Sequence, residues 1–283
     1  MTHRKSVPAD RPEAAMVEAA GLRWLAEPVQ SGGAAVVQVR AAAPGMLELE
    51  EIVEARPDPE AAEAFGAALA ITHRSLAEQG QTPPFGALPA EHPEGVAPFF
   101  GPAEDLRDVG AGTHDSWGAF HAAERIDPLL AELDVAPWAA DVESRTLLQR
   151  VRDRIASGAL DDDEPPARIH GDLWAGNVLW RAAPRGGGVS GASGTGPGGV
   201  EAVLIDPAAH AGHREADLAM LQLFGLPHLD RVMQGYQRTA PLRDGVEGRV
   251  PLHQLFPLLA HWALFGPGYA APTLRAAESV LRL

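Results

Sequence analysis

Three short apolar stretches, each joined to a polar side chain, constrain most strongly what this chain can fold into. They read ARIH, NVLWR and AVLIDP, and they lie between residues 167 and 207. Each has the length and composition of a short strand. Asp172 follows the first stretch, Asn177 opens the second and Asp206 lies near the end of the third. A tight loop would point Asp172 and Asn177 into one cleft, and we expect Asp206 to reach it too.

These side chains suit the transfer of a phosphoryl group. Two carboxylates and an amide oxygen are hard donors of the kind that bind Mg²⁺ together with phosphates. Phosphoryl transfer needs mainly positioning and charge neutralisation from a protein. We therefore predict that Asp172 accepts the proton of an acceptor hydroxyl, while Asn177 and Asp206 hold Mg²⁺ on nucleotide phosphates.

Two other interpretations of these residues stay open. The stretch from Asp172 to Asn177 could be an ordinary turn between two strands. The second alternative is a hydrolase metal site, because His210 and His213 are spaced like metal ligands. In that site the two histidines would join Asp172 and Asp206, and Asn177 would have no role.

The composition argues against several kinds of partner. The 283-residue chain has a formal net charge of −15 and a pI of about 5.1, so we expect no nucleic acid partner. It shows neither an apolar run of about 18 residues nor a signal-peptide pattern, so we expect no membrane span. Cysteine is absent, which excludes disulfides and fits a cytoplasmic location. No oligomeric state follows from these numbers.

The first part of the chain predicts a helix followed by a β-hairpin. Asp10 and Glu13 resemble a capping box ahead of a helix over 11–26. Alternating apolar and polar residues then predict two strands, over 34–41 and 46–53, joined by a turn.

The rest of the chain is predicted to be mainly helical around the three strands. Asp58 is the expected N-cap of the first of these helices. The segment 81–115 is predicted to be a long ordered loop, and the glycine-rich segment 186–199 a flexible insertion. The predicted helices span 59–78, 116–133 with a bend near Pro128, 142–157, 214–224, 228–239, 251–265 and 272–281.

The residues around the three strands resemble those of a known family. HGDLWAGN, followed by LIDPAAHAGHREADLAML, resembles the catalytic core of the fructosamine kinases, which group with the aminoglycoside phosphotransferase-like kinases. SWGAFHAAERIDPLL and EAAGLRWL are also similar to family segments. The resemblance implies a two-lobed, α+β, protein-kinase-like fold. It also implies ATP- and Mg²⁺-dependent phosphorylation of the 3-hydroxyl of ketosamines, the sugar adducts of amines and protein lysines. The phosphorylated adduct then falls apart, which repairs the amine.

The resemblance also assigns roles to single residues. Asp172 resembles the general base, and Asn177 and Asp206 resemble the Mg²⁺ ligands. Glu18 resembles the helix glutamate that pairs with a phosphate-binding lysine. Lys5 is the only lysine among 23 basic residues, and we expect it to be that lysine because a compact ammonium suits phosphates.

The adenine is expected to bind at a hinge between two lobes. MLELEEI resembles the strand that leads into the hinge, where the backbone of Glu50, Glu51 and Ile52 would hold the adenine. Relatives often carry an aromatic residue where this chain has Glu51. Backbone contacts would survive that change, whereas packing against the adenine is expected to be weaker.

Three further residues are expected to support the site. His170 is predicted to hydrogen-bond the loop backbone rather than to act as a catalyst. Asp217 is predicted to cap a helix or to orient the loop. Trp174 could pack against the sugar or fill the wall of the cleft.

The resemblance implies that the N-terminal lobe is truncated. Family members carry two further strands, joined by a nucleotide-covering loop, ahead of the lysine strand. Only four residues precede Lys5, so we expect a truncated lobe over 1–54 and a mostly helical catalytic lobe over 55–283. Two rival functions follow. The chain could phosphorylate another small hydroxylated substrate, such as an aminoglycoside- or choline-like molecule, or it could be a pseudokinase that binds without turnover.

Overall fold

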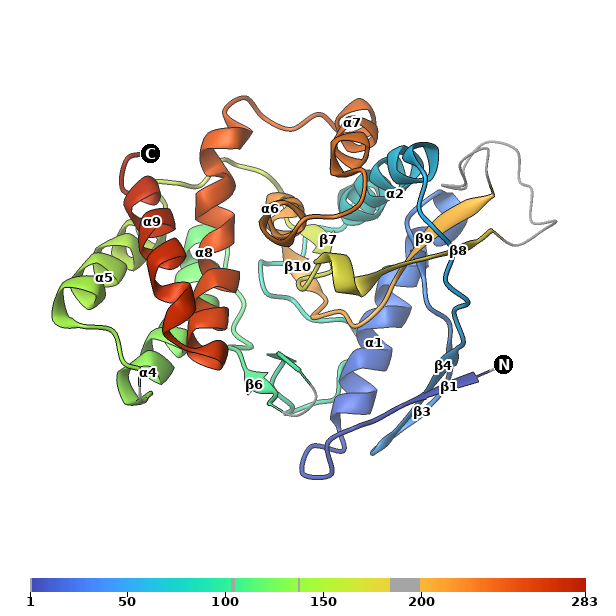
Figure 1. Ribbon diagram of the computed structural model, residues 1–283, viewed down its shortest axis with the longest axis horizontal. Helices are drawn as coiled ribbons and strands as arrows, with labels where there is room; N and C mark the ends of the chain where they lie inside the picture. The colour runs from blue at the N-terminus through green and yellow to red at the C-terminus, as the bar shows by residue number, and fades with distance from the viewer. Residues whose placement is uncertain (1, 103–104, 137, 184–198) are drawn as a thin grey trace.

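The computed structural model describes residues 2–102, 105–136, 138–183 and 199–283 (Figure 1). It combines small β-sheets with a mainly helical C-terminal part, so the predicted α+β class is confirmed. Within the described residues, no helix is long and apolar enough to cross a membrane. The predicted insertion at 186–199 lies outside the described residues except for its last glycine, and its flexibility stays a prediction.

An antiparallel sheet of three strands, covered by one helix, forms the N-terminal part of the fold. These elements are β1 (Thr2–Lys5), β3 (Val39–Ala43), β4 (Met46–Glu50) and α1 (Ala14–Ala26). β4 lies in the middle, and the predicted hairpin of β3 and β4 is confirmed. Leu47 and Leu49 alternate with glutamates along β4, and both are buried in one apolar cluster with Ala19 and Leu22 of α1.

The predicted strand over 34–41 is wrong in one respect, because it divides between two sheets. Its first half, β2 (Ala35–Val36), pairs in parallel with β9 (Val200–Leu204), whereas its second half belongs to β3. At the point of change the Val37 N–H donates to Leu204 O at 3.0 Å. This switch ties the N-terminal sheet directly to the central strands.

The central strands carry the polar residues that the sequence singles out. β8 (Val178–Ala182) pairs antiparallel with β9, and β7 (Ala167–Ile169) pairs antiparallel with β10 (His210–Gly212). The three predicted strands are therefore confirmed. β10 was not predicted, because three residues are too few to show a period of two.

The helices follow the predicted order, with changes at some ends. They are α2 (Pro59–Glu78), α3 (Trp117–Phe120), α4 (Asp127–Val135), α5 (Val142–Ala156), α6 (Arg214–Phe224), α7 (Leu229–Thr239), α8 (Val246–Phe265) and α9 (Ala270–Val280). α2 starts after the predicted N-cap, since Asp58 Oδ1 accepts a hydrogen bond from the Ala61 N–H at 2.7 Å. The predicted capping box of Asp10 and Glu13 is wrong, because α1 starts directly after Glu13 without a side-chain cap.

The predicted helix over 116–133 is divided into three parts. α3 is followed by a π-helical segment, His121–Ile126, and then by α4. Pro128 has no N–H and cannot donate to the preceding turn, so the regular α-helix restarts at Asp127.

Two other segments differ in smaller ways. The segment 81–115 has little regular structure, as predicted, apart from β5 (Phe99–Phe100) paired with β6 (Arg107–Asp108). α8 begins at Val246 rather than at Pro251, so this proline lies inside the helix and not at its first position.

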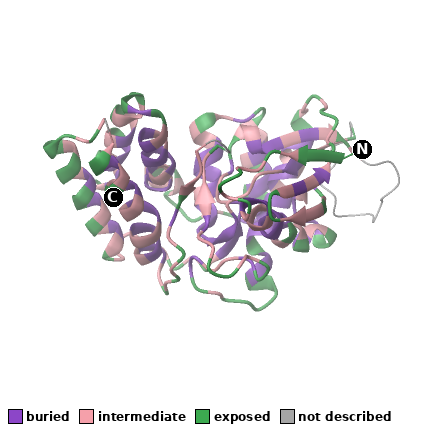
Figure 2. Cartoon of the chain, turned by 90° about the horizontal axis from the view of Figure 1, so that it is seen from below, coloured by how far each residue is buried: buried purple, intermediate pink, exposed green. Residues whose placement is uncertain are grey.

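Three apolar clusters make up the interior (Figure 2). One lies between α1 and the N-terminal sheet, and one lies among α2, α6, α7 and the strands β8 and β9. The third holds α3, α4, α5, α8 and α9 together. Figure 2 shows the buried residues along the inner faces of these elements, with exposed residues at the periphery.

α2 and α7 touch backbone to backbone. A Cβ atom placed on Gly66 would lie 1.9 Å from Val232 O, and one placed on Gly235 would lie 1.9 Å from Glu63 O. Real Cβ atoms do not approach main-chain atoms so closely. Each helix therefore needs a glycine where the other helix crosses it.

Gly66→Ala is expected to lower the free energy of unfolding by about 1–3 kcal/mol, even though alanine is favoured over glycine in helices by about 1 kcal/mol. The added methyl would overlap main-chain atoms of α7, which cannot move aside as a flexible side chain could. Gly248→Ala in α8 is the matched control, because a Cβ there comes no nearer than 3.8 Å to Leu283 Cδ2. Urea unfolding followed by circular dichroism measures both variants, and equal stabilities would contradict the close helix contact.

Candidate active site

A buried carboxylate fixes the loop that follows β7. Asp217, on α6, accepts hydrogen bonds from the backbone N–H groups of His170 at 2.7 Å and Gly171 at 2.9 Å. His73, on α2, reaches the same carboxylate through Nε2 at 3.1 Å. Burial alone would raise the pKa of Asp217, but the His73 ring and the His170 N–H outweigh burial and lower it. The ionised carboxylate therefore holds the direction of the loop backbone.

His170 closes the turn from inside. Its Nδ1 accepts a hydrogen bond from the Asp172 N–H at 3.2 Å, and its Nε2 lies 2.8 Å from Ile205 O. Because a carbonyl oxygen can only accept, the ring proton belongs on Nε2. Gly171 has a φ of +81°, and a Cβ there would lie 2.2 Å from Ala208 O, so only glycine fits. The turn thus presents Asp172 in one orientation.

Asp172, Asn177 and Asp206 converge at one place. Asn177 Nδ2 donates to Asp172 Oδ2 at 3.0 Å and lies 3.4 Å from the main-chain oxygen of Asp206. Asp206 has a left-handed backbone, with a φ of +54°, which is uncommon outside glycine and recurs at functional sites. Burial raises the pKa of Asp172, against the opposing effects of His170 and Asn177.

Lys5 lies between two carboxylates. Its Nζ is 2.7 Å from Glu18 Oε2 and 2.8 Å from Asp206 Oδ1. Burial alone would lower the pKa of Lys5, but the charges of Glu18 and Asp206 outweigh burial and raise it. The ammonium therefore stays protonated, and it joins β1, α1 and the chain after β9.

The structure does not bring the predicted adenine-binding residues to this group. Glu50 Oε1 accepts a hydrogen bond from Arg181 Nη1 at 2.7 Å, and Ile52 packs on the apolar cluster next to α1. Glu50, Glu51 and Ile52 do not line the cavity that Lys5 lines. Adenine binding by the backbone of these residues stays a prediction.

A cavity of about 610 Å³ lies beside the polar groups. Trp174 is 42% exposed on its wall, and the Trp174 ring meets the Phe224 ring edge on, with centroids 6.3 Å apart. The polar residues that also line this cavity include Lys5, Glu18, Asp172, Asn177 and Asp206. The cavity can therefore hold an acceptor molecule against the predicted base.

Four further residues of this cavity, which we call the aromatic wall, were not predicted. They are Phe224, His261, Phe265 and Tyr269. The His261 ring lies at the centre, with centroid distances of 4.8 Å to Phe224, 5.2 Å to Phe265 and 5.0 Å to Tyr269. His261 and Phe265 are four residues apart on one face of α8, and Tyr269 follows in the 3-10 turn Pro267–Tyr269 after the helix has ended. That spacing was visible in the sequence, but it does not say that the face borders a cavity.

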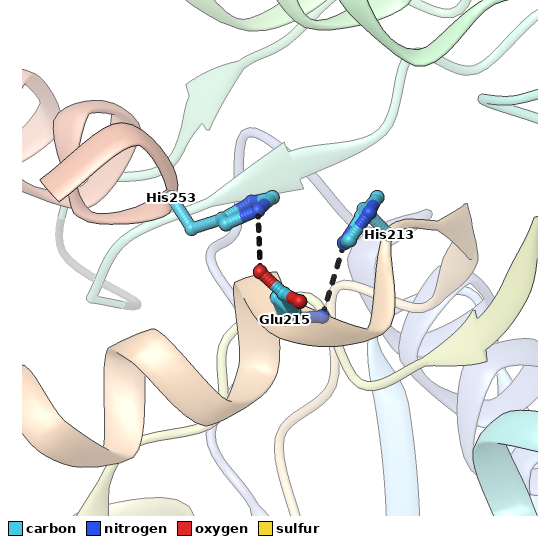
Figure 3. Close-up of side chains that lie close together, drawn as sticks. All are labelled: His213, Glu215 and His253. Atoms are coloured by element: carbon cyan, nitrogen blue, oxygen red, sulfur yellow. Dashed lines mark hydrogen bonds and ion pairs between the residues drawn. The ribbon is translucent and has the colours of Figure 1, made fainter. Parts of the chain in front are cut away.

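A second polar cluster lies at the start of α6 and on α8 (Figure 3). His253 Nε2 is 3.4 Å from Glu215 Oε2, and His213 Nδ1 accepts a hydrogen bond from the Glu215 N–H at 3.2 Å. These three are the described residues whose ligand atoms lie close enough to share a metal ion. However, Arg249 donates from Nε to Glu215 Oε2 at 3.0 Å and from Nη2 to Glu215 Oε1 at 2.6 Å. Asp162 Oδ1 lies 3.1 Å from His213 Nε2, within hydrogen-bond distance. Glu215 and His213 are therefore already held in ion pairs and hydrogen bonds, whereas His253 Nδ1 has no hydrogen-bond partner among the described residues.

The structure does not assemble the alternative hydrolase site. His213 belongs to the second cluster, and His210 Nδ1 donates to Ala208 O at 2.8 Å. Neither histidine lines the cavity on which Asp172 and Asp206 lie. These two aspartates share their surroundings with Lys5 and Asn177 instead.

Comparisons with known proteins agree with one another. The family model described as fructosamine kinase matches residues 16–282. A Thermobifida fusca YX-ER1 protein assigned to the fructosamine-3-kinases has a TM-score of 0.79 and 39% sequence identity, and the match covers 100% of this chain and 86% of that one. The ketosamine-3-kinase of Mus musculus is 32% identical over 160 residues, which are 56% of this chain and 45% of that protein. An Enterococcus faecium protein named as a ketoamine kinase is 31% identical over 159 residues, 56% of this chain and 50% of that protein.

The matches cover different shares of the relatives. The chain spans about half the length of the curated relatives it matches, and its fold is the protein-kinase-like fold of its structural neighbours, as predicted. The region matched by the family model starts after Lys5 and includes Asp172, Asn177 and Asp206. Because that model matches far more than half of the sequence, the chain belongs to the fructosamine kinase family.

Proposed function

We propose that this protein transfers the terminal phosphoryl group of ATP to the 3-hydroxyl of a ketosamine. The observation that supports this most is the meeting of Asp172, Asn177, Asp206 and Lys5 on one cavity. Together they offer a base, hard oxygen donors and a cation, which are the parts that phosphoryl transfer needs. Family membership supports a ketosamine as the acceptor. Phosphorylation at this hydroxyl would let the adduct fall apart and free the amine.

Asp172 has the properties of the base in this reaction. Its carboxylate lies on the cavity wall and is oriented by Asn177 Nδ2 at 3.0 Å. Because burial raises its pKa, Asp172 holds a proton more readily than an exposed aspartate does. We therefore assign it the proton that the acceptor hydroxyl loses as its oxygen attacks phosphorus.

Lys5 is the cation that we assign to the nucleotide phosphates. The Glu18 side chain next to it is 13% exposed, and Glu18 Oε1 is buried with no hydrogen-bond partner among the described residues. A buried carboxylate with an unused oxygen needs the nearby ammonium, so Glu18 is well suited to keep Lys5 in place. The ammonium would then turn from Asp206 towards phosphate oxygens, which carry more charge.

The donor set also fits Mg²⁺. The Asp206 side chain is 39% exposed, and the donation from Asn177 Nδ2 to Asp172 leaves Oδ1 as the end of the Asn177 amide that could bind a cation. When bound, Mg²⁺ would neutralise the charge of the phosphoryl group during transfer. The backbone of Glu50, Glu51 and Ile52 would hold the adenine, as the family resemblance implies.

Two rival functions would give different experimental results. A kinase for another small hydroxylated substrate would release ADP with an aminoglycoside- or choline-like acceptor and not with a ketosamine. A pseudokinase would bind nucleotide or ligand without releasing ADP at all. A coupled assay of ADP release over a panel of acceptors, with and without Mg²⁺, separates the three functions.

Asp172→Asn is expected to reduce turnover by about 10²–10⁴-fold, because an amide cannot accept the hydroxyl proton. The two side chains have nearly the same shape, so folding and ATP affinity should change little. Asp230→Asn is the matched control, since Asp230 is exposed on α7 and does not line the cavity. ADP release with fructosyl-lysine as acceptor measures both variants, and near-normal turnover of Asp172→Asn would remove Asp172 from the mechanism.

The pH profile should show the raised pKa of Asp172. The protonated carboxyl cannot act as a base, so kcat/KM should fall as the pH drops through the raised pKa. That pKa lies above the value of about 3.9 that is usual for aspartate. Circular dichroism at each pH checks that the protein stays folded. An acid limb at or below the usual aspartate value would contradict the effect of burial on this group.

Asn177→Ala and Asp206→Ala are expected to raise the Mg²⁺ concentration needed for half-maximal rate by about tenfold or more, because even residues outside the first ligand shell change metal affinity by 10–100-fold. Asp230→Ala serves as the control for the loss of one exposed carboxylate. The measurement is a Mg²⁺ titration of the initial rate at saturating ATP. An unchanged Mg²⁺ requirement, with only a lower maximal rate, would count against metal binding by these two residues.

A further inference from the structure

The exposed Trp and Phe side chains of the described residues gather at one cavity. Of the Trp, Phe and Tyr side chains that the structure describes, those classed as exposed are Trp174 at 42%, Phe224 at 37% and Phe265 at 56%. All three line the 610 Å³ cavity that Asp172 lines. Exposed apolar side chains that cluster in a groove commonly mark a binding surface.

Trp174 and the aromatic wall form a continuous series of rings that leads away from Asp172. Trp174, two residues after Asp172, contacts Phe224, and Phe224 contacts His261. His261 then contacts both Phe265 and Tyr269. A single sugar placed at Asp172 can cover the first one or two of these rings but not the whole series. The outer rings therefore remain for the part of the acceptor that lies beyond the sugar.

Among the described residues, the aromatic wall offers no partner for a charged substituent. The charged side chains that line the cavity in this part of the chain are Lys5, Glu18, Asp172 and Asp206, and the ion pairs of Lys5 link three of them into one group. Burial lowers the pKa of His261 despite the hydrogen bond that its Nδ1 donates to Pro257 O at 2.7 Å, so this ring is neutral at physiological pH. A carboxylate on the amine substituent would lose its hydration when it packs against these rings, and no cation there would compensate for that loss.

We propose that the aromatic wall selects ketosamines whose amine carries an apolar or aromatic substituent, and that it disfavours ketosamines of small or acidic amines. This inference rests on the proposed ketosamine kinase activity. The sugar would lie at Asp172 and Trp174, and the substituent on the amine would pack on Phe224, Phe265 and Tyr269. Aromatic rings attract one another at centroid distances of about 4.5–7 Å. The distances of 4.8 Å between Phe224 and His261 and 6.3 Å between Phe265 and Tyr269 lie in that range.

Three adducts of one sugar test the proposal, namely the fructosamines of benzylamine, methylamine and glycine. Only the substituent on the amine differs between them. We expect the KM for the benzylamine adduct to be about tenfold or more below that for the methylamine adduct, because burying a phenyl ring is worth at least that factor. The glycine adduct should have the highest KM. Isothermal titration calorimetry of the same adducts measures their binding without turnover.

The variant Phe265→Ala tests whether the aromatic wall causes the preference for the benzylamine adduct over the methylamine adduct. Phe265 is 56% exposed, so its loss should cost little stability. We expect this variant to raise the KM for the benzylamine adduct by about fivefold or more and to change that for the methylamine adduct by less than about twofold. Phe265→Leu should restore part of the preference, because it keeps apolar area. Val142→Ala is the control, since Val142 is 82% exposed on α5 and does not line the cavity.

The outcomes separate the inference from the proposed function. Turnover of all three adducts with equal kcat/KM would overturn the inference and leave the ketosamine kinase intact. A preference for the benzylamine adduct that Phe265→Ala leaves unchanged would also overturn it, because another surface would then be responsible. Neither turnover nor binding of any adduct would reject the proposed function, and the inference with it.

Discussion

The carboxylate of Asp217 is the interaction on which the rest of the site depends. It is buried, and it receives two backbone N–H groups from the loop after β7 and one ring nitrogen from His73. Three elements that are distant in sequence, α2, α6 and the loop, therefore meet at one charge. Without that charge two backbone donors would be buried without partners, which is costly. This arrangement fixes the backbone that leads into Asp172, and Asn177 then orients the Asp172 carboxylate.

The N-terminal sheet is joined to the catalytic strands by charge as well as by backbone pairing. Lys5 is at the end of β1, yet its ammonium lies against Asp206, which follows β9. A second link is Arg168 on β7, which is fully buried and pairs with Glu27 at 2.7 Å after α1. Lys5 is 25% exposed and Arg168 is fully buried, so each cation depends on its carboxylate partner and favours one relative position of the elements that carry the pair. These pairs therefore fix how the small sheet meets the helical part.

The sequence predicted most of the fold because the relevant signals are local. Asp58 and Pro59 mark the start of α2, and apolar periodicity marks most of the other helices. The grouping of Asp172, Asn177 and Asp206 could be foreseen because short strands on both sides fix where they lie. β10 has only three residues, too few to show a period of two, whereas the parallel pairing of β2 and the position of His73 beside Asp217 depend on partners more than 100 residues away. The aromatic wall was missed because its members come from separate helical segments, which no local sequence pattern brings together.

The glycine contact between α2 and α7 has a consequence for how this site can change over evolutionary time. Gly66 and Gly235 bring the two main chains together, and Tyr236, next to Gly235, hydrogen-bonds His73 at 2.8 Å. The distance between these helices is thus set by peptide groups and not by the volume of neighbouring side chains. Exchanges among the apolar residues of the surrounding core can then accumulate without moving the His73 ring. The position of His73, which contacts Asp217 beneath the catalytic loop, is therefore less sensitive to substitutions in the core.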